Sequence, residues 1–484
     1  MKLMTGILGV VIALLMLMYL AYRGISVLVL APVMALLAVL FEGGTPLLAS
    51  YTQVFMAATG DFIVQYFPLF LLGAVFGRLM DDSGSAGAIA SWSVRRLGSG
   101  RSILAVVLSC AVLTYGGVSL FVVAFAIYPV AAALFRENDV PKRLIPGAIA
   151  LGAFTFTMTA LPGTPAIQNA IPMPFFGTTP FAAPVLGTVS ALIMFSLGML
   201  WLSRRLRSAR AAGEGYGDHR DESPRADRKV REHAEGEGFD IAELNDRPAP
   251  AGMPGFAIAV LPILLVIALN YLFSMVVIPA MDTGYLELER YGGTDVDSVR
   301  GIWSIILALV ISIVVIVAFN RARFASLTES LDAGADASVL PIFNTASLVG
   351  FGAVIASLGA FELIKAGIMG IGVGNPLVSL AISVNVLAGI TGSASGGMSI
   401  ALSTLGADYV QMAREAGISL DLMHRVTTVA TGGLDSLPHN GAVITLLSIC
   451  GLTHRESYAD IFVVGVLAPI VSLVVLVALG TLLG

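Results

Sequence analysis

Long apolar runs, separated by short polar segments, recur from one end of the chain to the other. Runs of roughly 20 apolar residues can cross a bilayer as helices, and the pattern lacks the strict alternation of barrel strands. It therefore predicts an all-α polytopic membrane protein. The predicted spans are Leu3–Ala21, Ile25–Phe41, Phe62–Met80, Arg143–Leu161 continuing past Pro165, and Phe181–Leu202, then Phe256–Met275, Ile302–Phe319, Leu340–Ala366, Leu422–Leu434 continuing past Gly441, and Ile461–Leu483.

Two further apolar stretches, residues 103–135 and 376–405, are interrupted by glycine-rich sequence. The first is broken at Tyr115-Gly116-Gly117 and the second at Gly392–Gly397. Each arm is short for a full crossing, so both stretches are predicted to be re-entrant hairpins. Non-helical backbone at that depth is tolerated only where protein or a water-filled cavity surrounds it.

Each interrupted stretch belongs to a motif that occurs twice. Tyr115-Gly116-Gly117-Val118-Ser119 is followed by Leu161-Pro162-Gly163-Thr164-Pro165, and Ser395-Gly396-Gly397-Met398-Ser399 by Leu437-Pro438-His439-Asn440-Gly441. Broken helices at matching places in two halves of a membrane protein point to a transporter's binding site. The sequence thus predicts two repeats, 1–203 and 253–484, each with five crossings and one hairpin. Their broken helices span about 143–178 and 421–452, and the odd number of crossings makes the repeats inverted.

The distribution of charged residues predicts a linker between the two repeats and the orientation of the chain in the membrane. Only 12% of the residues are charged, whereas soluble domains carry about twice that share. Residues 204–252 are dense in both signs of charge and poor in aromatic residues, which predicts a cytoplasmic linker. Most Lys and Arg outside the spans fall on the same predicted side as this linker, so both termini are expected on the non-cytoplasmic side.

Helices that begin inside the membrane offer unpaired N–H groups and a partial positive charge. Four such starts are predicted, one after each glycine pair and one after each proline-containing break. Together they would form an anion site without Lys or Arg. The candidate substrate-binding residues are Gly116, Gly117, Ser119, Thr164, Gln168, Asn169, Ser393, Ser395, Gly396, Gly397, Ser399 and Asn440.

Ionisable groups inside the predicted spans are few, and each is a functional candidate. Asp435 and His439 flank Pro438 in the second break, so one or both are predicted to carry a coupling proton. Glu362 and Lys365 are expected to pair with each other near the end of their span. The other histidines, His219, His233, His424 and His454, are expected in loops.

Signs of enzyme chemistry are weak. The sequence contains no HExxH motif, no GxSxG motif with a plausible triad, and no Walker A motif, so neither a membrane enzyme nor an ATP-driven pump is favoured. No cofactor, metal or nucleic-acid partner is predicted. Secondary transport of a small organic anion is the leading hypothesis. A passive anion channel, a membrane enzyme and a partner-binding membrane protein are the alternatives.

At the repeated motifs the chain resembles the gluconate permease family of the ion transporter superfamily. The resemblance runs nearly end to end and is most specific at Tyr115–Phe121, Thr157–Asn169 and Leu434–Leu446. It implies proton symport of a sugar acid or hydroxy acid into a bacterial cell across the inner membrane. It also implies an inverted-repeat fold, elevator-type motion and a homodimer.

The chain departs from gluconate permeases at two of these motifs. They tend to carry an acidic residue in the first hairpin tip and a His-Pro pair in the first break. Here the sequence is Tyr115-Gly116-Gly117 and Gly163-Thr164-Pro165. The departures leave room for a shorter hydroxy acid such as 3-hydroxybutyrate. They also leave room for Na⁺ as the coupling ion, held by carbonyl and side-chain oxygens at half-helix ends.

Overall fold

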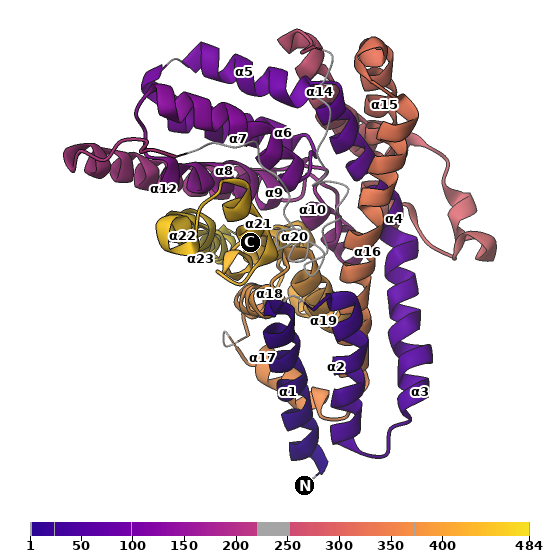
Figure 1. The fold of residues 1–484 in the computed structure, drawn as a ribbon. Coiled ribbons are helices and arrows are strands. Elements are labelled where there is room, and N and C mark those ends of the chain that lie inside the picture. Colours follow the sequence, from indigo (N-terminus) through magenta and orange to yellow (C-terminus); the bar gives the residue numbers. More distant parts are fainter. Residues whose placement is uncertain (1, 24, 98, 220–251, 372–373, 484) are drawn as a thin grey trace.

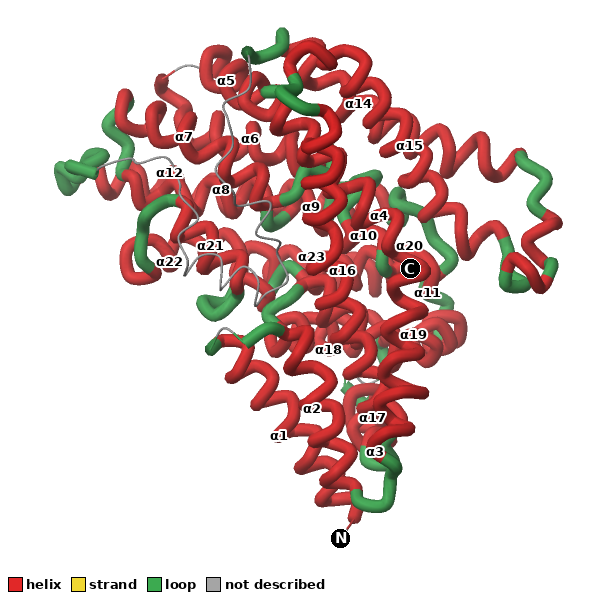
Figure 2. Tube along the Cα trace, turned by 45° about the vertical axis from the view of Figure 1, so that its right-hand side comes forward, coloured by secondary structure: helices red, strands yellow, loops and turns green. Residues whose placement is uncertain are grey.

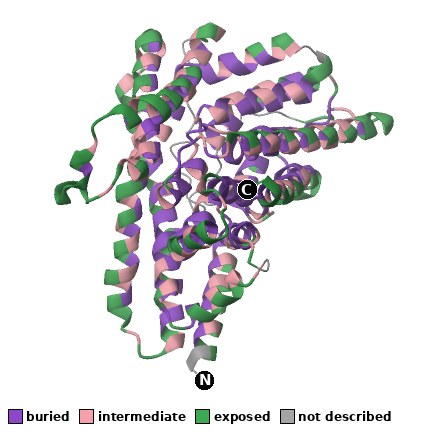
Figure 3. Cartoon of the chain, turned by 180° about the vertical axis from the view of Figure 1, so that it is seen from behind, coloured by how far each residue is buried: buried purple, intermediate pink, exposed green. Residues whose placement is uncertain are grey.

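The computed structural model of the chain describes residues 2–23, 25–97, 99–219, 252–371 and 374–483. Within these residues every regular element is a helix, which confirms the predicted all-α class (Figure 2). Eight helices in this part of the chain are long and apolar enough to cross a membrane. Their surfaces carry many exposed residues, while the buried ones gather where the elements meet (Figure 3).

The first half contains, in order, three apolar helical segments, a shorter helix, a hairpin, a broken helix and a final long helix. A π-helical segment, Ser50–Phe55, makes α3 and α4 continuous, so this span begins well before the predicted Phe62. The helices are α1 (Lys2–Tyr22), α2 (Val27–Glu42), α3 (Leu47–Ala49), α4 (Met56–Asp82), α5 (Ser85–Leu97), α6 (Ser102–Tyr115), α7 (Leu120–Glu137), α8 (Ile145–Ala153), α9 (Phe156–Thr159), α10 (Ile167–Ala170), α11 (Pro172–Phe176) and α12 (Pro184–Ala211).

The second half repeats this order of elements. Its last span runs through α22 and α23 without a break. The helices are α14 (Phe256–Leu272), α15 (Val296–Asn320), α16 (Leu327–Ser357), α17 (Phe361–Met369), α18 (Pro376–Thr391), α19 (Ala394–Glu415), α20 (Leu420–Thr431), α21 (Gly441–Ile449), α22 (His454–Phe462) and α23 (Ala468–Leu483).

Packing between the helices repeats as well. Helix α4 packs on α15 while α16 packs on α2, and α6 packs on α8 while α18 packs on α20. Helices α4 and α16 also lie against each other along much of their length (Figure 1). Equivalent helices of the two halves thus make equivalent contacts, and the inverted orientation of the halves stays a prediction.

Both hairpins turn at the glycine-rich interruptions. Gly117 lies at φ +93°, a conformation that favours glycine, and the Ser119 hydroxyl accepts a hydrogen bond from the Val122 N–H to cap α7. In the second hairpin Gly392 ends α18 in the left-handed conformation. Ser393 then caps α19 by accepting from the Gly396 N–H. Each tip is therefore a short turn that feeds directly into a new helix start.

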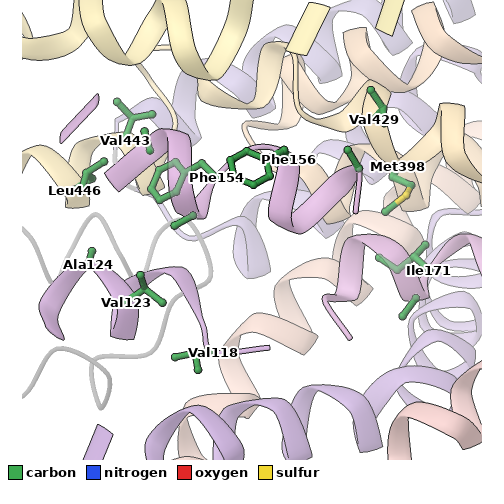
Figure 4. Close-up of a cluster of buried hydrophobic side chains, with 14 of the residues drawn as sticks. Val118, Val123, Ala124, Phe154, Phe156, Ile171, Met398, Val429, Val443 and Leu446 are labelled. Carbon is green, nitrogen blue, oxygen red and sulfur yellow. The ribbon is translucent and has the colours of Figure 1, made fainter. Parts of the chain in front are cut away.

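The two halves meet in one apolar cluster around the hairpins and the broken helices. Figure 4 draws part of it, with Phe154 and Phe156 of the first broken helix among side chains from α7, α19, α20 and α21. Helix α20 contacts α9 and α10, and α21 contacts α7. The broken helices, more than 240 residues apart in sequence, therefore lie side by side.

Several details differ from the sequence-based prediction. The amphipathic helix α5 occupies a segment expected to be a loop, and α12 continues to Ala211, into the predicted linker. The next residues are packed too, because Tyr216 is buried and its N–H donates to Asp139. The rest of the predicted linker, 220–251, lies outside the described residues. Lys365 pairs with Asp408 at 2.8 Å, so the expected Glu362–Lys365 pair is wrong.

Candidate functional site

The first broken helix is interrupted by a loop whose backbone is held by three neighbouring elements. The hydroxyl of Tyr115 donates to the carbonyl of Pro162 at 2.7 Å. The amide of Asn270 on α14 donates to the Gly163 carbonyl, and the Gly163 N–H donates to the Pro180 carbonyl. Gly163 itself has φ +83°. The break is therefore fixed by hydrogen bonds from the first hairpin, α14 and the segment after α11.

Asn169, just beyond this loop, uses all of its hydrogen-bonding capacity within the protein. Its Nδ2 donates to the carbonyls of Thr164 and Pro180, both at 3.0 Å. Its Oδ1 accepts from His424 Nε2 and Arg425 Nη1, both at 3.2 Å. Because an amide offers two donors and two acceptor positions, nothing on this side chain is left for a ligand.

His424 and Arg425 are fully buried in α20, so the expectation that His424 lies in a loop is wrong. The His424 ring donates from Nε2 to Asn169 and accepts at Nδ1 from the Thr178 hydroxyl. The Arg425 guanidinium donates mainly to backbone carbonyls, and also to Asn169 Oδ1 and the Thr428 hydroxyl. These carbonyls belong to Thr159, Pro180 and Ala182.

The second broken helix is organised around its cap. After α20 a single helical turn, Leu434–Ser436, precedes the extended segment that leads to Asn440. Asn440 Oδ1 accepts from the N–H groups of Ala442 and Val443 and so caps α21. Its Nδ2 donates to the carbonyl of Gly392 at the tip of the second hairpin. This one side chain therefore ties the second hairpin to the second break.

The break separates its two ionisable residues. Asp435 is buried, and its carboxylate accepts a hydrogen bond from the Ser436 hydroxyl at 3.2 Å. His439 is half-buried, and its Nε2 donates to the Gly389 carbonyl. The two side chains line different hollows, because His439 lies beside Arg23 and His454 in a separate recess. A direct Asp435–His439 pair is therefore absent from the described structure.

Asp435 lines a cavity of about 140 Å³, here called the Asp435 cavity. Asp435 is the one ionisable side chain among the described residues around it. The apolar part of the lining includes Val27, Phe70, Leu120 and Phe154. The polar part comes from both breaks, the second hairpin tip and α16. Its polar members are Gln168, Asn344, Thr345, Thr391, Ser393, Ser395, Asp435, Ser436 and Asn440.

A second cavity of about 190 Å³, here called the Ser119 cavity, adjoins the first. It lies between the first hairpin tip and the first break, and it contains no ionisable side chain among the described residues. Its polar lining is Thr114, Ser119, Gln168 and Ser338. Phe70, Leu120, Met158, Ile167, Gln168 and Pro341 line both cavities and form the wall between them.

Comparison with known proteins supplies the context for these cavities. The chain is 46% identical over 460 residues to the uncharacterised transporter YxjC of Bacillus subtilis, with 94% of each chain covered. The chain is a member of this transporter family. No protein-family model matches the sequence.

Two solved transporter structures share the fold of this family member. Neisseria gonorrhoeae MtrF, which is described among antimetabolite efflux pumps, aligns with TM-score 0.54 and 12% identity over 90% of this chain and 84% of its own. The YdaH transporter of Alcanivorax borkumensis aligns with TM-score 0.53 and 16% identity over 88% and 87%. The relatives are transporters rather than enzymes, so the chain is a multi-pass membrane transporter.

The predicted site residues of this transporter fall into three groups. Gln168, Ser393, Ser395, Asp435 and Asn440 line the Asp435 cavity. Gly117, Ser119 and again Gln168 line the Ser119 cavity. The remaining predicted residues line neither: Gly116, Thr164, Asn169, Gly396, Gly397, Ser399 and His439.

The glycines outside the cavities serve close packing instead. A Cβ on Gly116 would meet Ile263 of α14, and one on Gly396 would meet Leu348 of α16. A Cβ on Gly397 would meet the backbone of Ala388, across the second hairpin. Asn344 and Thr345 of the cavity lining were missed, because they sit in an apolar run that reads as an ordinary span. The single signal was the Pro341-Ile342-Phe343-Asn344-Thr345 sequence, with polar residues one turn after a proline.

Proposed function

We propose that this transporter is a symporter that takes up a small organic acid anion together with a proton, with the Asp435 cavity as the binding site. The observation that carries the proposal is the buried carboxyl group of Asp435 in a cavity whose other described lining residues are neutral. This group is the natural carrier of the coupling proton. His439 is a weaker candidate, since it lines a different recess.

Charge repulsion explains why such a cavity would couple the two species. Two unit charges about 4 Å apart interact by about 4 kcal/mol at an effective dielectric of 20. An anion beside an ionised Asp435 would therefore bind about a thousandfold more weakly than beside a protonated one. Binding of the anion then requires a proton on Asp435, and proton binding is favoured by the anion in return.

Neutral groups are proposed to hold the anion itself. Ser393 and Ser395 stand at the start of the 22-residue helix α19, where the helix dipole favours negative charge. Gln168 and Asn440 add amide groups from the two breaks. The cavity contains no Lys or Arg among the described residues, in keeping with an anion site built from helix ends and polar side chains.

Cavity size and lining favour a short substrate. Sites for drug-sized ligands are typically about 300–1,000 Å³, and the Asp435 cavity is about 140 Å³. Phe70, Leu120 and Phe154 supply apolar surface on its walls. A short hydroxy acid such as 3-hydroxybutyrate suits this environment better than gluconate does.

The wider proposal follows from the resemblance to gluconate permeases. It comprises import across the inner membrane of a bacterium, both termini on the non-cytoplasmic side, a homodimer, and elevator-type motion of one domain. The repeated order and packing of the helices support the inverted repeats that such motion uses.

The test is uptake of labelled 3-hydroxybutyrate and gluconate into vesicles that contain the purified protein. We expect an inward proton gradient to drive accumulation of 3-hydroxybutyrate. Asp435→Asn should abolish the pH-driven accumulation, and His439→Gln should retain most of it. Normal pH-driven accumulation by the Asp435→Asn variant would contradict the proton assignment.

Two other outcomes identify the alternatives. Accumulation that needs a sodium gradient instead would favour a sodium symporter, with Na⁺ at Asp435 and the surrounding oxygens. Equilibration of the substrate without accumulation under either gradient would favour a passive channel.

A further inference from the structure

Asn344 of α16 is an unusual member of the Asp435 cavity. It is 5% exposed, and neither its Oδ1 nor its Nδ2 has a hydrogen-bond partner among the described residues. Buried amides are almost always hydrogen-bonded, so a buried and unpaired amide in a residue that lines a cavity calls for a partner. Asn169, by contrast, is equally buried and fully bonded.

The neighbours of Asn344 do not share this property. The Thr345 hydroxyl donates to the Pro341 carbonyl at 3.0 Å, a group in the same helix. Ser393 is engaged in capping α19, and Ser395 lies 3.4 Å from the hydroxyls of both Ser393 and Thr345. Among the buried polar side chains of the described lining, Asn344 is thus the one whose polar atoms have no partner, whereas Gln168 is partly exposed.

The donor and acceptor of the Asn344 amide restrict which ligand groups can pair with both of them. An asparagine side chain presents an acceptor and a donor next to each other. A carboxylate can only accept, so it would leave Oδ1 unpaired. A hydroxyl both donates and accepts, and it can satisfy either end or both through neighbouring groups.

We infer that Asn344 is a specificity-determining residue that recognises a hydroxyl group on the transported anion, so that the substrate is a hydroxy acid rather than a simple carboxylate. The inference rests on the proposed function, because it places the anion in the Asp435 cavity. A site that hydrogen-bonds a substrate hydroxyl strongly rejects the analogue without it, since its buried polar group is then left unpaired. Asn344 therefore excludes the corresponding deoxy acid.

The experiment compares 3-hydroxybutyrate with butyrate in vesicles under a proton gradient. We expect the wild type to show an apparent KM at least tenfold lower for the hydroxy acid. Asn344→Leu should raise the KM for 3-hydroxybutyrate tenfold or more and change that for butyrate less than threefold. Asn344→Ala takes its place if the Leu variant is not recovered folded.

Thr445→Val is the matched control, because the Thr445 hydroxyl is also buried and unpaired but lies outside both cavities. It should keep the wild-type preference. A wild type that transports both acids equally well would overturn the inference and leave the proposed function standing. An equal loss of both acids in the Asn344 variants would assign the residue a structural role instead. A wild type that transports neither acid under a proton or sodium gradient would overturn the proposed function, and the inference with it.

Discussion

The two broken helices carry similar sequence but use their polar groups in opposite ways. In the first, Asn169 makes four hydrogen bonds, and the loop carbonyls accept from Tyr115, Asn270 and Arg425. In the second, Asp435 accepts from its neighbour Ser436 and otherwise faces a cavity. The loop of the first break is thus held by protein partners while Gln168, just beyond it, lines both cavities, whereas the second break presents a buried carboxyl group to the Asp435 cavity.

The difference shows that a repeated motif need not have a repeated role. The first break contains no ionisable residue, yet it is held by a buried cation that the second repeat supplies through α20. The second break is instead held by hydrogen bonds from His454 to Pro438, from Tyr458 to Ser436 and from Asn440 to Gly392. We therefore assign a structural role to the loop of the first break, apart from Gln168, and the proposed proton chemistry to the second break.

The largest effect is expected from replacing Arg425, the buried cation that holds the first break. Arg425→Met would leave the carbonyls of Thr159, Pro180 and Ala182 without this donor. Each buried group left unpaired costs on the order of 1–3 kcal/mol, and whole domains are stable by about 5–15 kcal/mol. We expect most of the variant to be lost as folded protein in size-exclusion chromatography.

Two further variants sharpen this result. Arg425→Lys keeps the charge but not the planar fork, so it should recover only part of the stability. Arg414→Met removes an exposed arginine and should behave as the wild type. Wild-type stability of Arg425→Met would mean that the first break needs no brace, and the contrast between the breaks would then fail.

A smaller effect is expected at the second hairpin, where two adjacent glycines face different neighbours. A Cβ on Gly397 would meet the backbone of Ala388, which cannot move without separating α18 from α19. A Cβ on Gly396 would meet the end of the Leu348 side chain, which can rotate away. Overpacking costs typically about 1–3 kcal/mol.

We therefore expect Gly397→Ala to lower the melting temperature and to abolish most uptake, and Gly396→Ala to lose less of both. The measurement is uptake per folded protein, alongside thermal unfolding. Equal tolerance of both substitutions would show that the hairpin arms are not in the close contact that holds its tip at the Asp435 cavity.

Much of the fold was accessible from the sequence because membrane spans and helix breaks have strong local signals. The apolar runs, the interruptions around Gly117 and Gly392, and the helix start after Asn440 all depend on neighbouring residues. Most predicted spans and both hairpin interruptions therefore lie close to the observed elements. The spans of α4 and α16 begin well before the predicted Phe62 and Leu340, and α19 begins before its glycine pair. The amphipathic α5 was missed because a short helix with a polar face resembles a charged loop in composition.

The site was harder to predict because it depends on contacts between distant residues. Asn169 and Asn344 are the same residue type in apolar surroundings, and only the partners supplied by α20 distinguish them. Arg425 falls inside the predicted span Leu422–Leu434, and its structural role could not be predicted because its carbonyl partners lie more than 240 residues away. Sequence spacing could not indicate which polar side chains find hydrogen-bond partners within the protein and which do not.

The smallest effect is expected where the first broken helix leaves the packed core. Arg143, just before α8, pairs with Glu214 at 2.6 Å and with the buried Asp460 at 3.2 Å. The hydrogen bond from Arg143 lowers the pKa of Glu214 below its ordinary value. A carboxyl group with a lowered pKa stabilises the fold above its unfolded pKa, and this contribution is lost as the pH falls through the folded pKa, below about pH 4.

Because Glu214 is 40% exposed, water screens the pair, and such pairs contribute about 0–1 kcal/mol. Glu214→Gln should therefore lower the melting temperature at pH 7 by no more than about 2 °C. It should also flatten the acid side of the stability profile slightly, as followed by thermal unfolding between pH 3 and 7. If Glu214→Gln lost as much stability at pH 7 as Arg425→Met, the first broken helix would depend on Glu214 as well as on Arg425. Glu214 lies outside the first break, in the segment that follows α12.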